Sequence, residues 1–318
     1  MRLERTYVAL ARPVDVFHER VEALDAAMVI ARASPKKGPV HSLRTAARCV
    51  EAQLSLLEML PGLPPHKEEA DEVRKRLKKV RRATGVVRDL DVQRDLIQRD
   101  VLTKTRWGKD SRDKSLRSDA LRLRRHLKRR REQMSMKMVK VLCKEEGKLA
   151  LALLSLEDAL ETARNRILPV QQLAARIERW FHLNTARSHQ FGSTHTQTKE
   201  GNVLASPMQV SEKLDRETLH ELRKRAKLCR YMVESLPLGY RSSRQIAIRF
   251  RDIHEAGGNW HDWLLLEEVA SERKGKQADL TKRYAERRLQ ALGDYRSQLM
   301  DSPRGAVPAQ VRQVESRS

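Results

Sequence analysis

Apolar residues recur at intervals of three and four along almost the whole chain, and this spacing limits the fold more than any other feature. Two clear examples are the sets Leu116, Ala120, Leu123, Leu127 and Val73, Leu77, Val80, Val87. Because an α-helix turns once in 3.6 residues, this spacing collects apolar side chains on one face of a helix. No stretch alternates convincingly, as a half-buried strand would. The sequence therefore predicts an all-α protein.

Segments rich in Pro, Gly, Ser or Asp divide this helical pattern. They are residues 34–39, 61–65, 107–113 and 236–243, with a weaker interruption near Pro169. Helices joined by such short breaks pack as antiparallel bundles. The longest polar stretch, 188–213, predicts a loop or linker, and the residues from 302 on predict a disordered tail. We therefore expect a first helical repeat in 1–187, a linker in 188–213, a second repeat in 214–301 completed by adjacent helices, and a tail in 302–318.

Positive charge dominates the composition. The chain has 65 Lys and Arg against 42 Asp and Glu, a formal net charge of +23. Such an excess favours anionic partners. Only 4% of residues are aromatic, which argues against proteins that read single-stranded nucleic acid by stacking bases on aromatic rings. The partner expected from composition is therefore rich in phosphate and needs no stacking.

The densest charge with helical order lies in "LHELRKRAKLCRY", residues 219–231. At 100° per residue, one helix face carries His220, Arg223, Lys224, Lys227, Arg230 and Tyr231, and apolar residues occupy most of the rest. No carboxylate is interleaved on this face, so the pattern predicts a bound anion that relieves the repulsion between the cations. A solvated basic face is the ordinary alternative for a single helix of this kind.

A second copy of the pattern favours a binding role. In "VHSLRTAARCVEAQL", residues 40–54, the side chains of His41, Arg44 and Arg48 repeat the His220, Arg223 and Lys227 spacing of zero, three and seven. Each copy is followed by a glycine with a polar residue and Asp three positions later: Gly85, Arg88, Asp89 and Gly258, His261, Asp262. The intervals from histidine to glycine are 44 and 38 residues. The sequence therefore predicts an internal duplication.

These segments resemble the CHAD domain, the conserved-histidine α-helical domain. The resemblance rests on "HSLRTAAR", "HELRKRAKLCRY" and "GVVRDLDV" and spans roughly residues 15 to 300. It implies two four-helix-bundle repeats related by a pseudo-twofold axis, with a basic central cavity. It also implies binding of inorganic polyphosphate without known catalysis. The first copy departs from the second, because Thr45 and Glu51 stand where the second has Lys224 and Arg230.

The candidate polyphosphate-binding residues combine the two basic helices with the helix before Asp89. They are His41, Arg44, Arg48, Lys78, Arg81, Arg88, His220, Arg223, Lys224, Lys227, Arg230 and Tyr231. The segment "LRLRRHLKRRR" adds a second set, which is either a further basic wall or a solvated or nucleic-acid-binding surface: Arg117, Arg124, Arg125, Lys128 and Arg131. For His41 and His220 two roles stay open, a buried hydrogen-bonding residue or a cation beside phosphate.

No catalytic constellation, cofactor motif or metal-ligand spacing stands out in the sequence. We therefore predict a binding protein and not an enzyme, with inorganic polyphosphate as partner, no cofactor, no metal and no membrane partner. The alternatives are a nucleic-acid-binding helical protein or, less favoured, a metal-dependent polyphosphate or triphosphate hydrolase. The expected location is cytoplasmic, in association with polyphosphate granules.

Overall fold

The computed structural model describes residues 9–103, 111–191, 215–237 and 241–300. Within them the chain is helical throughout, apart from one pair of two-residue strands. The helices are α1 (Pro13–Ala33), α2 (Lys37–Glu58), α3 (Lys67–Ile97), α4 (Ser111–Leu160), α5 (Val170–Phe191), α7 (Arg216–Glu234), α8 (Arg241–Lys274) and α9 (Asp279–Met300). The π-helical turn η1 (Gln98–Leu102) follows α3, and the short 3-10 helix η2 (Glu161–Ala163) follows α4. The all-α prediction is confirmed.

The two strands, β1 (Leu10–Ala11) and β2 (Leu168–Pro169), pair antiparallel beside the start of α5. The sequence analysis missed them, because two residues are too few to show an alternating pattern.

The predicted breaks between helices fall where the helices end. The turn after Ala33 and the Pro-rich turn after Glu58 are confirmed, and in the latter Gly62 has a φ of +68°, which glycine adopts without strain. The break near Pro169 is confirmed as well. The predicted loop at 188–213 starts too early, because α5 continues through Phe191. The rest of that loop, most of the break at 107–113 and the tail from 302 lie outside the described residues.

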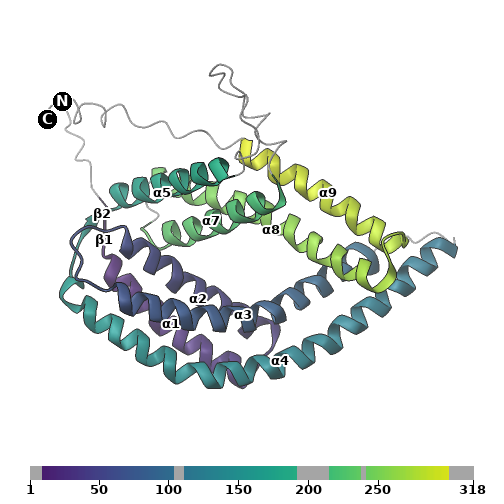
Figure 1. Cartoon of the computed structure of the whole chain (residues 1–318), viewed down its shortest axis with the longest axis horizontal. Coiled ribbons are helices and arrows are strands. Elements are labelled where there is room, and N and C mark those ends of the chain that lie inside the picture. Colours follow the sequence, from purple (N-terminus) through teal and green to yellow (C-terminus); the bar gives the residue numbers. More distant parts are fainter. Residues whose placement is uncertain (1–8, 104–110, 192–214, 238–240, 301–318) are drawn as a thin grey trace, which may run out of the picture.

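The helices form two groups, which lie one above the other in Figure 1. In the first group α2 packs on α1 and α3, and α4 packs on α1 and α3. In the second, α7 packs on α5 and α8, and α8 packs on α9. Between the groups α2 contacts α7, α3 contacts α8 and α4 contacts α9. Since α5 packs on α7 and α8, it lies with the second group, although the sequence analysis assigned it to the first repeat.

One buried carboxylate joins the end of α3 to α9. The side chain of Asp100, in η1, is only 4% exposed. It accepts a hydrogen bond from Arg283 Nε at 2.5 Å and another from Arg287 Nε at 2.9 Å. Burial alone would raise the pKa of Asp100, but the hydrogen bond and charge of Arg283, together with Arg287, outweigh it and lower the pKa below its usual value.

Replacing Asp100 by Ala should therefore destabilise the fold. Two arginines would lose their shared partner, and because both are partly exposed to solvent the loss should be about 1–3 kcal/mol. Urea denaturation followed by circular dichroism at neutral pH measures the loss. Because the folded-state pKa is lowered, the stabilisation by Asp100 is present at neutral pH and disappears as the pH falls below about 4, the unfolded value. An Asp100→Ala protein as stable as the parent at pH 7 would contradict this account.

Candidate functional site

A cavity of about 520 Å³ lies between the two helix groups, with α2 and α7 as facing walls and residues of α3 and α8 completing it. Its basic side chains are Arg44, Arg48, Arg88, Arg223, Lys224, Lys227 and Arg230. Its acidic side chains are Asp89, Glu234, Glu255 and Asp262. Seven cations against four carboxylates leave the walls with a positive excess.

Three of these cations are neutralised by carboxylates. Arg88 of α3 donates from Nη1 and Nη2 to the two carboxylate oxygens of Asp262 of α8, at 2.8 and 3.3 Å. Lys224 pairs with Glu221 on its own helix. Arg230 pairs with Glu234 at 2.7 Å and with Glu255 at 3.2 Å. The expectation that no carboxylate lies between the cations of residues 219–231 is therefore wrong, because Glu221 and Glu234 reach them.

The other four cations have no ion-pair partner among the described residues. They are Arg44 and Arg48 on α2 and Arg223 and Lys227 on α7, the residues at positions three and seven of each motif. The Nε atoms of Arg48 and Arg223 are buried without a hydrogen-bond acceptor in the described part of the chain. Arg44 Nη1 donates only to the backbone oxygen of Arg81, at 3.5 Å. We call these four residues the unpaired cation set.

Two glycines let the arginines at position three lie close to the neighbouring helix. A Cβ atom on Gly85 would stand 2.8 Å from Arg44 Nη1. On α8, a Cβ atom on Gly257 would stand 3.0 Å from Arg223 Cγ and 2.9 Å from the Tyr295 ring. The sequence analysis had matched Gly258 to Gly85, but Gly258 faces open space. The adjacent Gly257 is the residue that makes the close approach.

Burial and the repulsion between neighbouring cations lower the pKa values of basic side chains in the cavity. Desolvation, followed by the charges of Arg48, Arg44 and Arg223, lowers the pKa of Lys227 to about 6. Burial, with a contribution from Arg44, lowers the pKa of Arg48 to about 10. A cation that loses its proton this readily is short of negative charge nearby. The cavity therefore favours an anion electrostatically.

Two histidines on α8 line the cavity in their neutral form. His254 Nδ1 lies 3.1 Å from Arg230 Nη1 and accepts its hydrogen bond, while burial and then Lys227 lower the pKa of His254 to about 2. Burial and Arg223 lower the pKa of His261 to about 3. The sequence analysis missed His254, Glu234, Glu255, Asn259 and Thr45 as lining residues. Helical spacing offered one signal for His254, since it lies one turn before Gly258 on the same helix.

The two motif histidines differ in position. His41 lines the cavity, with a pKa lowered by burial and then by Arg88. His220 lies outside it, in an adjoining cavity of about 460 Å³, where its ring centroid is 4.9 Å from that of His261. Burial and Arg223 lower the pKa of His220 as well. Tyr231 lines the main cavity, with the Arg230 guanidinium 5.9 Å from its ring centroid.

The remaining candidates lie elsewhere. Lys78 is exposed and Arg81 pairs with Glu51 of α2, so neither lines the cavity. Arg124, Lys128 and Arg131 line a separate cavity of about 320 Å³ beside α3, where Asp91, Asp95 and Glu132 also lie. Arg131 Nε donates to Asp91 at 3.1 Å. Arg117 and Arg125 are exposed on α4. The second basic set therefore does not face the cavity between the groups.

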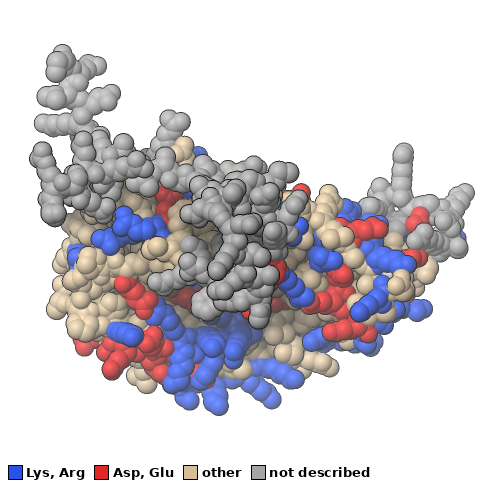
Figure 2. Space-filling view, turned by 45° about the horizontal axis from the view of Figure 1, so that its top comes forward, with Lys and Arg blue, Asp and Glu red and all other residues tan. Residues whose placement is uncertain are grey.

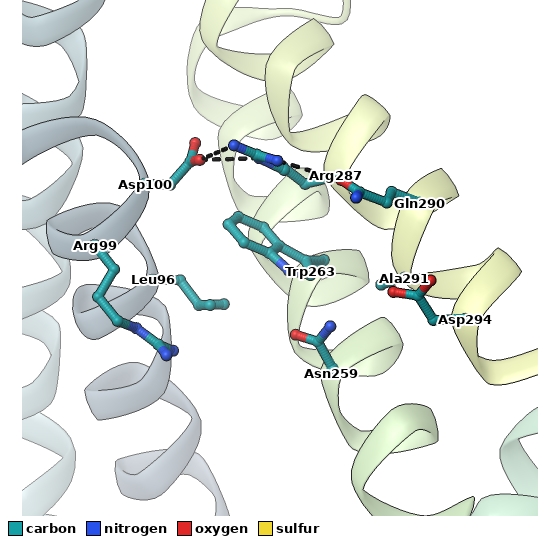
Figure 3. Close-up of a pocket in the computed structure, with 9 residues that line it drawn as sticks. All are labelled: Leu96, Arg99, Asp100, Asn259, Trp263, Arg287, Gln290, Ala291 and Asp294. Atoms are coloured by element: carbon teal, nitrogen blue, oxygen red, sulfur yellow. Dashed lines mark hydrogen bonds and ion pairs between the residues drawn. The ribbon is translucent and has the colours of Figure 1, made fainter. Parts of the chain in front are cut away.

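A neighbouring pocket of about 320 Å³ shares Asn259 with the main cavity. In Figure 3 its walls come from the end of α3 with η1, from α8 and from α9, and Arg287 points toward Asp100. This ion pair neutralises Arg287, and the other cation of the pocket, Arg99, is exposed rather than half-buried. Basic side chains also gather on the outer surface, as Figure 2 shows. The distinguishing feature of the main cavity is therefore four half-buried cations without carboxylate partners.

Among the described residues, no group of three or more His, Cys, Asp or Glu side chains could hold a metal ion. In the same part of the chain, no helix is both long enough and apolar enough to cross a membrane.

Comparisons with known proteins identify the family. A search of curated proteins found no match to the sequence. Among solved structures, the crystal structure of the CHAD domain from the plant Ricinus communis is similar, with a TM-score of 0.58, 15% identity and 95% of each chain covered. PptA from Streptomyces chartreusis is also similar, with a TM-score of 0.54, 11% identity, and coverage of 90% of this chain and 97% of that one. The family model of the CHAD domain matches residues 15–271. The chain therefore belongs to the CHAD domain family.

Proposed function

We propose that the cavity binds inorganic polyphosphate. The observation that carries this proposal is the unpaired cation set, in which Arg44 and Arg48 of α2 face Arg223 and Lys227 of α7 without a carboxylate partner. Polyphosphate carries a negative charge on each internal phosphate, so it can meet several cations in sequence. Arginine forks engage two oxygens at once, and charge-assisted hydrogen bonds of this kind are among the stronger ones in proteins.

The enclosed position of the set favours a single phosphate chain over duplex nucleic acid. A duplex is read by a helix or ribbon that projects into a groove about 12 Å wide. The unpaired cations instead lie half-buried between helices, where a thin and flexible chain fits better. Attachment to a polyphosphate granule would follow from the same contacts.

We also infer that α2 and α7 are corresponding helices of a duplicated unit. Support comes from the equal positions of their unpaired cations and from the two glycines beside Arg44 and Arg223. Because α5 packs on α7 and α8, the boundary between the two repeats falls between α4 and α5. This boundary is earlier in the chain than residue 187, where the sequence predicts the end of the first repeat. Carboxylates neutralise Lys224 and Arg230, the additional cations of α7. Each of the two helices therefore contributes two unpaired cations to the proposed binding.

Charge reversal of one residue from each helix tests the proposed site. We expect Arg48→Glu with Lys227→Glu to weaken long-chain polyphosphate binding about a hundredfold at physiological salt, because two charge-assisted contacts are lost. Calorimetry or fluorescence anisotropy measures the affinity. The matched control is Arg82→Glu with Arg244→Glu, an equal change in net charge at exposed positions outside the cavity. Equal losses in the two variants would mean that net charge, and not this cavity, determines binding.

Binding should also take up protons. In the free protein the pKa of Lys227 is about 6, so its amine is mostly neutral at pH 8, and a bound phosphate would raise the pKa and recharge it. Affinity should therefore rise as the pH falls from about 8 to 6. Calorimetry in two buffers of different ionisation enthalpy counts the protons.

Lys227→Arg is the matched variant for this experiment, since arginine stays charged throughout the range. It should bind polyphosphate with a weaker pH dependence and a smaller proton uptake. His41, His254 and His261 also line the cavity. Undiminished uptake in Lys227→Arg would show that these histidines, and not Lys227, take up the protons.

Competition separates the proposed ligand from its main alternative. We expect long-chain polyphosphate to displace labelled duplex DNA or RNA from the protein at physiological salt, and nucleic acid to displace labelled polyphosphate poorly. Both affinities fall with rising salt as counterions are released, so the comparison is made at one fixed salt concentration. Stronger binding of nucleic acid, abolished by Arg48→Glu with Lys227→Glu, would overturn the assignment. Release of orthophosphate from polyphosphate with magnesium or manganese would instead identify a hydrolase.

A further inference from the structure

The outward face of α4 carries a long basic surface that the cavity does not use. Eight exposed cations belong to it, and we call them the α4 cationic face: Arg122, Arg125, Arg129, Arg130, Lys137, Lys140, Lys144 and Lys148. At 1.5 Å per residue, they extend over about 39 Å. No ion pair joins any of the eight to a carboxylate of the described residues.

These cations share one side of the helix, opposite the core. At 100° per residue they lie within about half of the circumference, and no Asp or Glu falls on that side between Arg122 and Lys148. The buried residues Leu127, Leu142 and Leu149 lie on the other side, toward α3 and α1. In Figure 1, α4 runs along the outer edge of the molecule, so its free side faces outward.

Exposed apolar side chains lie on the same side of α4, one among the cations and two beyond the last of them. Met136, Leu151 and Leu154 are 63%, 70% and 61% exposed, and they are the three most exposed large apolar residues in the described part of the chain. At 100° per residue, Leu151 lies about 10° from the midline of the α4 cationic face, whereas Met136 and Leu154 lie about 50° from it. Leu151 and Leu154 follow Lys148, on the continuation of the face toward the end of the helix, where Asp158 is also exposed. Together with the cations on the same side of the helix, these side chains would suit a partner that has apolar material beneath a negative surface.

We propose that the α4 cationic face binds peripherally to the surface of an anionic lipid bilayer. A surface that combines exposed lysines and arginines with exposed apolar side chains suits the bilayer interface. The apolar side chains enter the boundary between headgroups and acyl chains, while long basic side chains reach the lipid phosphates. Nucleic acid offers phosphates to the cations but no apolar layer to Met136, Leu151 and Leu154.

This contact is peripheral, so it agrees with the finding that no described helix could cross a membrane. It departs from the expectation of no membrane partner, which rested on the lack of a spanning segment. The inference does not rest on polyphosphate binding, because the cavity and the α4 cationic face share no residue.

Vesicle binding of the full chain tests the proposal. The vesicles are phosphatidylcholine alone and an equal mixture of phosphatidylcholine with phosphatidylglycerol. We expect binding to the anionic vesicles only, and Lys137→Glu with Lys140→Glu and Lys144→Glu should weaken it about tenfold or more. The matched control, Arg82→Glu with Arg244→Glu and Lys282→Glu, changes net charge equally at exposed positions outside α4. Absence of binding to anionic vesicles, or an equal loss in the control, would overturn the proposal.

A second pair of variants distinguishes lipid from nucleic acid. Leu151→Ser with Leu154→Ser should weaken vesicle binding, most clearly at high salt, where charge attraction is screened. Leu183→Ser with Leu289→Ser, at residues 59% and 57% exposed on other helices, should not. If duplex DNA binds more tightly than the vesicles and the Leu151 and Leu154 pair leaves both unchanged, the face is a nucleic-acid surface instead. Polyphosphate affinity should be retained in the three-lysine variant, and its loss would show that the face binds polyphosphate rather than lipid.

Discussion

The repulsion between cations on the facing walls of the cavity is the constraint on which the rest of the structure depends. Seven basic side chains converge between the two helix groups, and bringing like charges together in a partly buried space is costly. The fold offsets part of this cost with carboxylates that link the groups. The guanidinium of Arg88, on α3, donates two hydrogen bonds to the carboxylate of Asp262, on α8. One cation of the cavity therefore also links the two helix groups. At the far end of α3, Asp100 joins η1 to α9 through Arg283 and Arg287.

The carboxylates neutralise some cations of the cavity and leave others unpaired within the described residues. The unpaired cations define the proposed binding site. Glu221, Glu234 and Glu255 neutralise Lys224 and Arg230, whereas the residues at positions three and seven of both motifs form no ion pair with any carboxylate of the described ranges. The repulsion between the cavity cations appears in the lowered pKa of Lys227, and the Nε atoms of Arg48 and Arg223 are buried without an acceptor among the described residues. The polyphosphate chain that we propose as the ligand would supply the negative charge that these groups lack. Binding affinity in such a site comes from charge that the fold has left uncompensated, not from the total number of basic residues.

The two basic regions of the molecule differ in what surrounds the charge. In the cavity, cations are half-buried, desolvated and ordered by neighbouring helices, an environment that strengthens electrostatic contacts with a thin polyanion. On α4 the cations are fully solvated and spread over a long surface, together with exposed Met136, Leu151 and Leu154. Each exposed charge of this kind adds its own contribution to the attraction toward a wide anionic surface. The partners that we propose for the two regions differ for this reason, although the basic residue types are the same.

Sequence periodicity determined the helical class and the main turns, because the period of apolar residues depends only on local helix geometry. The repeated His-x-x-Arg spacing likewise identified Arg44, Arg48, Arg223 and Lys227, since residues at positions three and seven of one helix must share a face. The pairs Lys224–Glu221 and Arg230–Glu234 lie within one helix, so spacing alone could have indicated them. Tertiary structure alone brought Glu255 and Asp262 from another helix to Arg230 and Arg88. It also placed Arg81 and Arg131 outside the cavity and brought His254 into it. Charge at a site depends on every element packed around it, and sequence spacing reports only one element at a time.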